Sequence, residues 1–544
     1  MLFPIPALCG TGSGNKADPH RGGTLRLVAA SSGGTLDPQI NYSAQYINLL
    51  DVVYDGLLSF RKSRGPDGND VVADLAETVP APEDGGLTWT FTLRPDLRFS
   101  DGRPVTVDDV AASFRRIFKA GSPTAGAFYS GIRGADLCMR DPSRCTLAEG
   151  VVTDRQRRTI SFHLRSPDTE FLQKIAFPHA CILPADTPDH DMGNTPIPGT
   201  GPYRIVSYDP DRGMRMERNP WFHVWNLQAQ PEGYPDIITY TFGVPNEAAV
   251  TAIENGQYDL FYDPVPLDRM AELGARFADR THIEPHPQAF YAFMNVNIPP
   301  FNSQAARQAV NYAMDRRAMV ILYGGRAIAT PLCDMVPSSV KGHAPVCMYS
   351  RDAPAPEWKA PDMARARKLV QSSGTVGQDV TVVTSSGSVE TAMGNRLRDT
   401  LQQLGYHVSL RTLTPGVFFS YIQNSSNRMQ IAIKSWAHDY PSPSNFLDAL
   451  FGCENFHPGS DNSINMSGFC NKEIQAIMDR AKTNTGLTED QRLALWQEAG
   501  RRIMEQSPAA PMIEMNSVKI HSARVRNYFY TPLYEILVSQ IQVQ

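Results

Sequence analysis

The residues best suited to ligand chemistry lie together near position 436. The segment Lys434-Ser435-Trp436-Ala437-His438-Asp439 contains a cation, an indole, an imidazole and a carboxylate. Residues 429–433 alternate between apolar and polar, which is typical of a half-buried strand, and Pro441 and Pro443 end that strand. Ligands of open α/β sheets bind at the carboxyl ends of strands, so we interpret the segment as a binding site. The alternative is an ordinary strand exit with a core Trp and a solvated Asp.

The elements that would position this segment alternate between strands and helices. A long helix is predicted over 305–323. It is followed by strands and helices over 379–383, 388–404, 407–410, 415–424 and 429–433. Such a series implies parallel strands joined by right-handed crossovers. Trp436 and Asp439 should then lie at the carboxyl edge of a parallel sheet.

Length, charge and motifs exclude several classes of function. At 544 residues the chain is too long for one core, and its net charge of −5 argues against nucleic acid or an anionic membrane as a partner. There is no apolar run of about 18 residues, no G-x-S-x-G or H-E-x-x-H motif and no P-loop. The twelve histidines show no metal-ligand spacing. We therefore expect no catalytic residues, no metal site and no cofactor.

The cysteines fall into three neighbouring pairs and two isolated residues. The pairs are Cys138 with Cys145, Cys333 with Cys347, and Cys453 with Cys470, each in a loop-like stretch. Three local disulfides would suit an oxidising compartment, and the alternative is six unrelated thiols. Cys181 lies among apolar residues and is interpreted as a buried thiol.

Cys9 follows a short apolar stretch and precedes a glycine-rich one. This arrangement is similar to the end of a bacterial lipoprotein signal, with Cys9 as the lipidated residue. The signal is incomplete, because it has no basic start and Leu8 stands where a small residue is expected. A start placed too far downstream would explain this, and the alternative is an ordinary disordered terminus.

Several stretches, taken in order, resemble the extracytoplasmic solute-binding proteins of bacterial ABC transporters, in the peptide/nickel family. The likeness runs from about residue 22 to the end. The stretches are Thr35-Leu36-Asp37-Pro38, Tyr54-Asp55-Gly56-Leu57-Leu58, Leu87-Thr88-Trp89-Thr90-Phe91-Thr92-Leu93, Phe99-Ser100-Asp101-Gly102, Gly199-Thr200-Gly201-Pro202-Tyr203, Glu217-Arg218-Asn219-Pro220 and Gln308-Ala309-Val310-Asn311-Tyr312-Ala313-Met314.

The resemblance implies an α/β, two-lobed periplasmic-binding-protein fold of type II, with an additional α+β domain inserted in the first lobe. Residues 1–21 would be a signal remnant and flexible linker. Lobe 1 would comprise 22–60, 197–283 and 508–544, the inserted domain 61–196, and lobe 2 284–507. A ligand, most simply a peptide, would be buried between closing lobes and delivered to a membrane permease. We expect a monomer in the periplasm or cell envelope, with Cys9 as the candidate site of a lipid anchor.

The resemblance also suggests roles for individual residues. Asp439 would pair with the α-ammonium of a peptide, since a buried ammonium needs a carboxylate partner. Ser435 and Ala437 would act through their backbones and Trp436 as an apolar or cation–π wall. His438 either selects a ligand carboxylate or points outward. The remaining expected ligand-binding residues are Ser32 and Gly34, in the turn after the first strand, and Tyr129 of the inserted domain.

Other functions are compatible with parts of this pattern. On the same fold the ligand could be an opine, a sugar or a nickel chelate. A chaperone-like or signalling receptor would also share the fold. A secreted hydrolase is the alternative from a different class, and the missing catalytic motifs argue against it.

Overall fold

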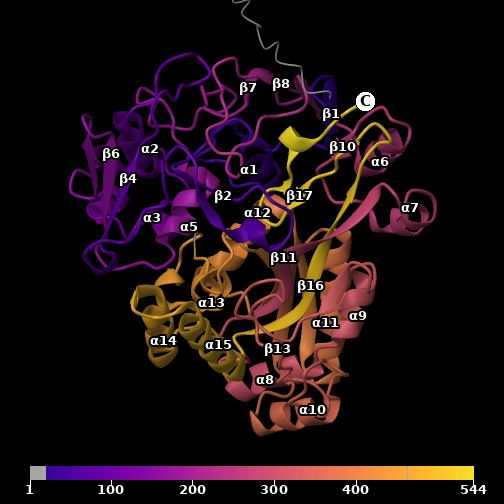
Figure 1. Ribbon diagram of the computed structural model, residues 1–544. Coiled ribbons are helices and arrows are strands. Elements are labelled where there is room, and N and C mark those ends of the chain that lie inside the picture. The colour runs from indigo at the N-terminus through magenta and orange to yellow at the C-terminus, as the bar shows by residue number, and fades with distance from the viewer. Residues whose placement is uncertain (1–19, 462) are drawn as a thin grey trace, which may run out of the picture.

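Two large β-sheets organise the protein, one in the upper and one in the lower half of Figure 1. The computed structural model describes residues 20–461 and 463–544. Cys9 and the expected signal remnant up to residue 19 therefore lie outside the described residues. No helix in the described ranges is long and apolar enough to cross a membrane.

The upper sheet has five strands in the order β10-β1-β9-β8-β7. The first strand pairs in parallel with β9 and β10, whereas β7, β8 and β9 form an antiparallel meander. Leu25 and Leu27 of the first strand are fully buried, as its alternating pattern requires. The strands are β1 (Thr24–Val28), β7 (Tyr203–Asp209), β8 (Gly213–Arg218), β9 (Ile237–Thr241) and β10 (Leu260–Phe261).

The lower sheet has six strands in the order β12-β16-β11-β15-β13-β14 and is mixed. Its strands are β11 (Thr281–Met294), β12 (Ala329–Pro331), β13 (Asp379–Ser385), β14 (His407–Leu413), β15 (Ile431–Ala437) and β16 (Ala509–Ile520). The predicted parallel series is present as β14-β13-β15. The sheet as a whole is not parallel, because β11 pairs antiparallel with both β15 and β16. Strand periodicity does not reveal the direction of a partner that is distant in sequence.

Helices cover the lower sheet, and one predicted helix is divided. The helix expected over 305–323 breaks into α8 (Gln304–Ala313) and α9 (Arg316–Leu322), because the Asp315 side chain accepts the backbone N–H of Ala318 and starts a new helix. The others are α10 (Met363–Ser372), α11 (Ser388–Gln403), α12 (Pro415–Gln423), α13 (Ser444–Phe451), α14 (Lys472–Thr483) and α15 (Glu489–Gln506).

The segment between β2 (Leu58–Phe60) and β7 builds a separate apolar core on the left of Figure 1. Its small antiparallel sheet packs against the long helix α2, which begins with a capping box between Thr106 and Asp109. The elements are β3 (Val71–Ala73), β4 (Thr88–Thr92), α2 (Val107–Lys119), α3 (Ala125–Tyr129), α4 (Ala135–Arg140), β5 (Val151–Asp154), β6 (Thr159–His163) and α5 (Phe171–Ala176).

The long strands β11 and β16 connect the two halves. Beyond Ile520 the tail returns to the upper half, where β17 (Tyr530–Thr531) and β18 (Glu535–Ile536) join its core together with α1 (Ala44–Leu50). The first part of the tail, residues 509–515, packs instead in the core of the lower half. The apolar tail thus has a partner in each half.

The structure joins Cys138 to Cys145, Cys333 to Cys347 and Cys453 to Cys470, and leaves Cys181 as a buried free thiol. We expect the double change Cys453→Ser/Cys470→Ser to lower the free energy of unfolding by about 3 kcal/mol, because the unfolded chain gains loop entropy. Chemical denaturation measures this loss, and non-reducing peptide mass spectrometry identifies the pairs. Equal stability of the double variant and the parent would contradict a structural role for this disulfide.

Candidate ligand-binding site

A cavity of about 280 Å³ lies where the two halves and the inserted segment meet. This volume is close to the lower end of the range for small-molecule pockets, roughly 300–1,000 Å³, and suits a small ligand. The wall from the lower half is β15 with the residues that follow it, together with the start of β11. The other walls come from the N-terminal segment, the inserted segment and the tail. Its lining includes Tyr42, Asn48, Phe177, His286, Gln288, Phe419, residues 434–439, Leu533, Tyr534 and Glu535.

Asp439 lies in this cavity, directly after the end of β15. One of its carboxylate oxygens accepts the hydroxyl of Tyr42, and the other accepts Asn445 Nδ2 at 3.0 Å. Asn445 also accepts the backbone N–H of Asp439 at 3.0 Å through its Oδ1, which fixes the turn. Burial raises the pKa of Asp439 although both hydrogen bonds favour its ionised form. In the described chain its two side-chain partners are neutral, so a cationic group on a ligand would be its first oppositely charged partner.

Tyr42 brings the upper half of the molecule to Asp439. Its ring stays 43% exposed because it forms part of the cavity wall, and it stands edge-on to Phe177. Burial of the hydroxyl, and then the nearby charge of Asp439, raises the pKa of Tyr42. The hydroxyl therefore stays protonated and donates to the carboxylate across the two halves.

The carboxyl half of β15 has one unpaired edge. On one side it pairs with β11 along its whole length, from Ile431 to Ala437. On the other side β13 pairs with Ile431 and Ala432 only. Within the described chain, residues 434–437 thus have no strand on that edge, and they line the cavity. Their backbone groups are placed to pair with an extended ligand, as in recognition by strand addition.

The structure gathers five of the eight expected ligand-binding residues at this cavity: Ser435, Trp436, Ala437, His438 and Asp439. The Trp436 indole donates to the carbonyl of Asn445 at 2.9 Å, which holds the ring as a wall. His438 lines the cavity, with its backbone N–H bonded to the carbonyl of Pro287.

Ser32, Gly34 and Tyr129 are not among the residues that line this cavity. Gly34 is exposed, with its carbonyl bonded to the hydroxyl of Tyr208. Tyr129 is fully buried in the core of the inserted segment, where its hydroxyl donates to the carbonyl of Lys174 at 3.0 Å. Apolar packing against Phe114 and Phe128 holds it there, away from the cavity.

Sequence reasoning missed several residues that line the cavity: Tyr42, His286, Gln288, Lys434 as a site residue, and Glu535. Lys434 belongs to the segment singled out in the sequence, and its positive charge could have identified it as a candidate site residue. Its ammonium lies 5.1 Å from the centre of the Phe419 ring, and burial lowers its pKa. No local sequence pattern distinguishes Tyr42 or Glu535, because both are distant in the chain from residues 434–439 and come close to them only in the folded protein.

A second contact joins the inserted segment to the turn after Asp439. The buried carboxylate of Glu170 accepts the hydroxyls of Ser442 and Ser444, the latter at 2.6 Å. Nearby, the Thr169 N–H donates to the carbonyl of Lys482 at 2.9 Å. These bonds hold the inserted segment against the lower half.

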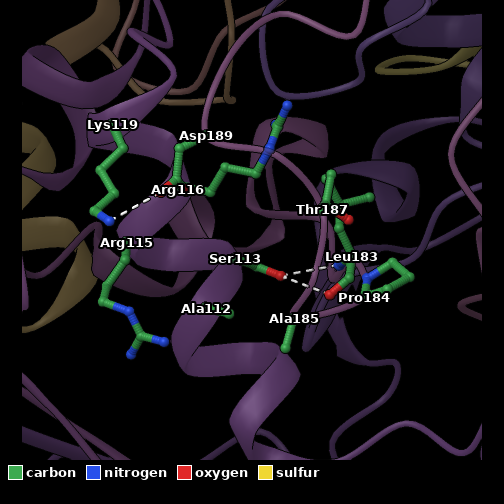
Figure 2. Close-up of a pocket in the computed structure, with 10 residues that line it drawn as sticks. All are labelled: Ala112, Ser113, Arg115, Arg116, Lys119, Leu183, Pro184, Ala185, Thr187 and Asp189. Atoms are coloured by element: carbon green, nitrogen blue, oxygen red, sulfur yellow. Dashed lines mark hydrogen bonds and ion pairs between the residues drawn. The ribbon is translucent and has the colours of Figure 1, made fainter. Parts of the chain in front are cut away.

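A smaller cavity of about 160 Å³ lies between α2 and the segment 183–189 (Figure 2). Two of its polar side chains have protein partners: Lys119 pairs with Asp189 at 2.9 Å, and Ser113 bonds to the backbone of Leu183. The Arg116 guanidinium pairs with the buried carboxylate of Asp37. The Arg116–Asp37 pair fastens the inserted segment to the N-terminal segment.

A cavity enclosed between two sheet-based halves, with an open strand edge and a half-buried carboxylate, is the arrangement of a solute-binding protein. The chain belongs to family 5 of the bacterial extracellular solute-binding proteins, whose middle region matches residues 70–458. It is 23% identical to the probable D,D-dipeptide-binding periplasmic protein DdpA of Escherichia coli, over 94% of this chain and 92% of that protein. It is 25% identical to the probable di/tripeptide-binding protein 5 of Pseudomonas aeruginosa, over 97% of each chain.

Solved structures show the same fold. The clavulanic acid biosynthesis oligopeptide binding protein 2 superposes with a TM-score of 0.86 at 23% identity, covering 96% of each chain. The murein tripeptide binding protein MppA of Escherichia coli superposes with a TM-score of 0.75 at 20% identity, covering 96% of this chain and 98% of that one. The expected two-lobed type II fold with an inserted α+β domain is therefore confirmed.

Proposed function

We propose that this protein captures a short peptide between its two lobes and delivers it to an ABC-transporter permease. The observation that carries the proposal is the unpaired edge of β15, which ends at the half-buried carboxylate of Asp439. A peptide can pair its backbone with that edge while its α-ammonium pairs with Asp439. The named ligands of the relatives support it, since they include a D,D-dipeptide and di- or tripeptides.

Lys434 provides a positive charge that could bind the terminal carboxylate of a peptide. Its ammonium forms no salt bridge with a carboxylate of the described residues, although the more distant charge of Glu390 acts on it. Lys434 lines the cavity at the opposite end of the site segment from Asp439. A peptide running antiparallel to β15 would place its amino end at Asp439 and its carboxylate towards Lys434. Five steps of an extended strand span roughly 16 Å, and the lysine side chain shortens that gap. A ligand of two to four residues fits.

The domain division and the cellular setting belong to the same proposal. Lobe 1 would comprise 22–60, 197–283 and the tail beyond Ile520, with 61–196 inserted. Lobe 2 would comprise 284–507 together with β16, which pairs in the lower sheet. The two lobes would hinge at β11 and β16, which cross between the halves. The protein would act outside the cytoplasm as a monomer, with Cys9 as a lipid anchor.

A thermal-shift screen tests the function. Di-, tri- and tetrapeptides with free termini are expected to raise the melting temperature, because ligand at 100 times its dissociation constant adds about 2.7 kcal/mol. Opines, sugars and nickel–histidine chelates form the comparison set. Mass spectrometry of the recovered peptide should find it intact, since a carrier does not cleave its ligand. Stabilisation by an opine or a sugar but by no peptide would overturn the proposal.

A further inference from the structure

Two imidazoles in the ligand cavity lack hydrogen-bond partners. Both ring nitrogens of His438, and Nδ1 of His286, are buried without a partner in the described chain. Both residues line the cavity, and the His438 backbone is bonded to Pro287, next to His286. A neutral imidazole offers one donor and one acceptor, and buried polar atoms are normally paired. A ligand that forms hydrogen bonds with these nitrogens should bind more tightly than one that leaves them unpaired.

The electrostatics of the cavity favour a neutral partner for these rings. Burial, and then the neighbouring His286, lowers the pKa of His438 to about 3, so the ring is uncharged near neutral pH. Burial likewise lowers the pKa of His286. The carboxylate of Asp439 lines the same cavity and would repel a further anion, whereas the carboxylate of Glu535 is paired with Lys519. The ligand side chain that best fits these two imidazoles is therefore uncharged and can both donate and accept a hydrogen bond.

We propose that His438, with His286 beside it, is a specificity site for a neutral side chain that both donates and accepts hydrogen bonds. A carboxamide, as in Asn or Gln, is the best match because its oxygen accepts and its nitrogen donates. The site reads the first residue of the bound peptide, because His438 directly precedes Asp439. This inference rests on the proposed function, in which Asp439 holds the α-ammonium.

Isothermal titration with three dipeptides of similar shape tests the proposal: Asn-Ala, Leu-Ala and Asp-Ala, with Ala-Ala as the reference. The parent protein is expected to bind Asn-Ala about ten- to a hundredfold more tightly than Leu-Ala, since Leu leaves the imidazoles unpaired. His438→Phe keeps a ring without hydrogen-bonding groups and should remove most of this preference. His438→Gln should retain part of it. The matched control is His407→Phe, at an exposed histidine of β14, which should leave the preference unchanged.

The possible outcomes separate this inference from the proposed function. Equal affinity for Asn-Ala and Leu-Ala, tighter binding of Asp-Ala, or a preference that persists in His438→Phe would each overturn the histidine site while leaving peptide binding in place. If the parent binds none of the four dipeptides and no longer peptide, the peptide function fails and this site with it. Ala-Ala binding and circular dichroism check the fold of each variant. If His438→Phe does not fold, His286→Phe provides the same comparison and should reduce the preference.

Discussion

Asp439→Asn is expected to weaken the binding of Ala-Ala and Ala-Ala-Ala by roughly 150- to 5,000-fold. The change leaves the ligand ammonium in the cavity without its carboxylate, and removing one partner of a buried charge pair costs about 3–5 kcal/mol. The amide keeps nearly the same shape and can still contact Tyr42 and Asn445. Isothermal titration measures the loss. The control is Asp211→Asn, at an exposed turn, which should bind as the parent does.

The pH dependence provides a second check on Asp439. Burial raises the pKa of Asp439 in the folded protein. The protonated form therefore stabilises the fold below the ordinary carboxyl pKa of about 3.9, and this contribution is lost as the pH rises through the raised pKa. Without ligand, Asp439→Asn should therefore be at least as stable as the parent at pH 7. Ligand affinity has the opposite sign, because the ammonium needs ionised Asp439 and binding weakens as the pH falls. Unchanged affinity in Asp439→Asn would remove this residue from the site.

Arg116→Met is expected to lower the free energy of unfolding by about 3–5 kcal/mol. The Arg116 guanidinium is 2% exposed and makes two bonds to Asp37, which is fully buried. It also donates to Gln39 at 3.0 Å and to the carbonyls of Pro188 and His190, each at 2.7 Å. All five of its N–H groups are thus used. The methionine would leave the Asp37 carboxylate buried beside an apolar side chain.

Lys119→Met is the matched control for this change, on the same helix and beside the same cavity (Figure 2). Lys119 pairs with the exposed Asp189, and an ion pair near the surface contributes about 0–1 kcal/mol. Chemical denaturation of both variants measures the difference. The double variant Arg116→Met/Asp37→Leu should recover part of the loss, because no charge is then left unpaired. A loss as small for Arg116→Met as for Lys119→Met would contradict a structural role for this pair.

The sequence predicted the local parts of this protein well. The alternation before Trp436 identified β15 and placed the candidate ligand-binding residues at a strand end, where the structure has the cavity. The spacing of the cysteines indicated the three neighbouring pairs that the structure joins. Both signals are local, because strand periodicity and short loops depend on residues close together in the chain. The ordered set of short stretches added the family and the two-lobed fold.

The tertiary structure decided what the cavity contains and which residues face each other across it. Tyr42 reaches Asp439 from the other end of the chain, and Glu535 enters from the tail. Tyr129, expected at the ligand, is instead packed in the inserted core. The antiparallel partner β11 closed one edge of β15, and the short ladder with β13 left the other edge open. Contacts of this kind depend on how distant segments pack together, and no local periodicity in the chain encodes them.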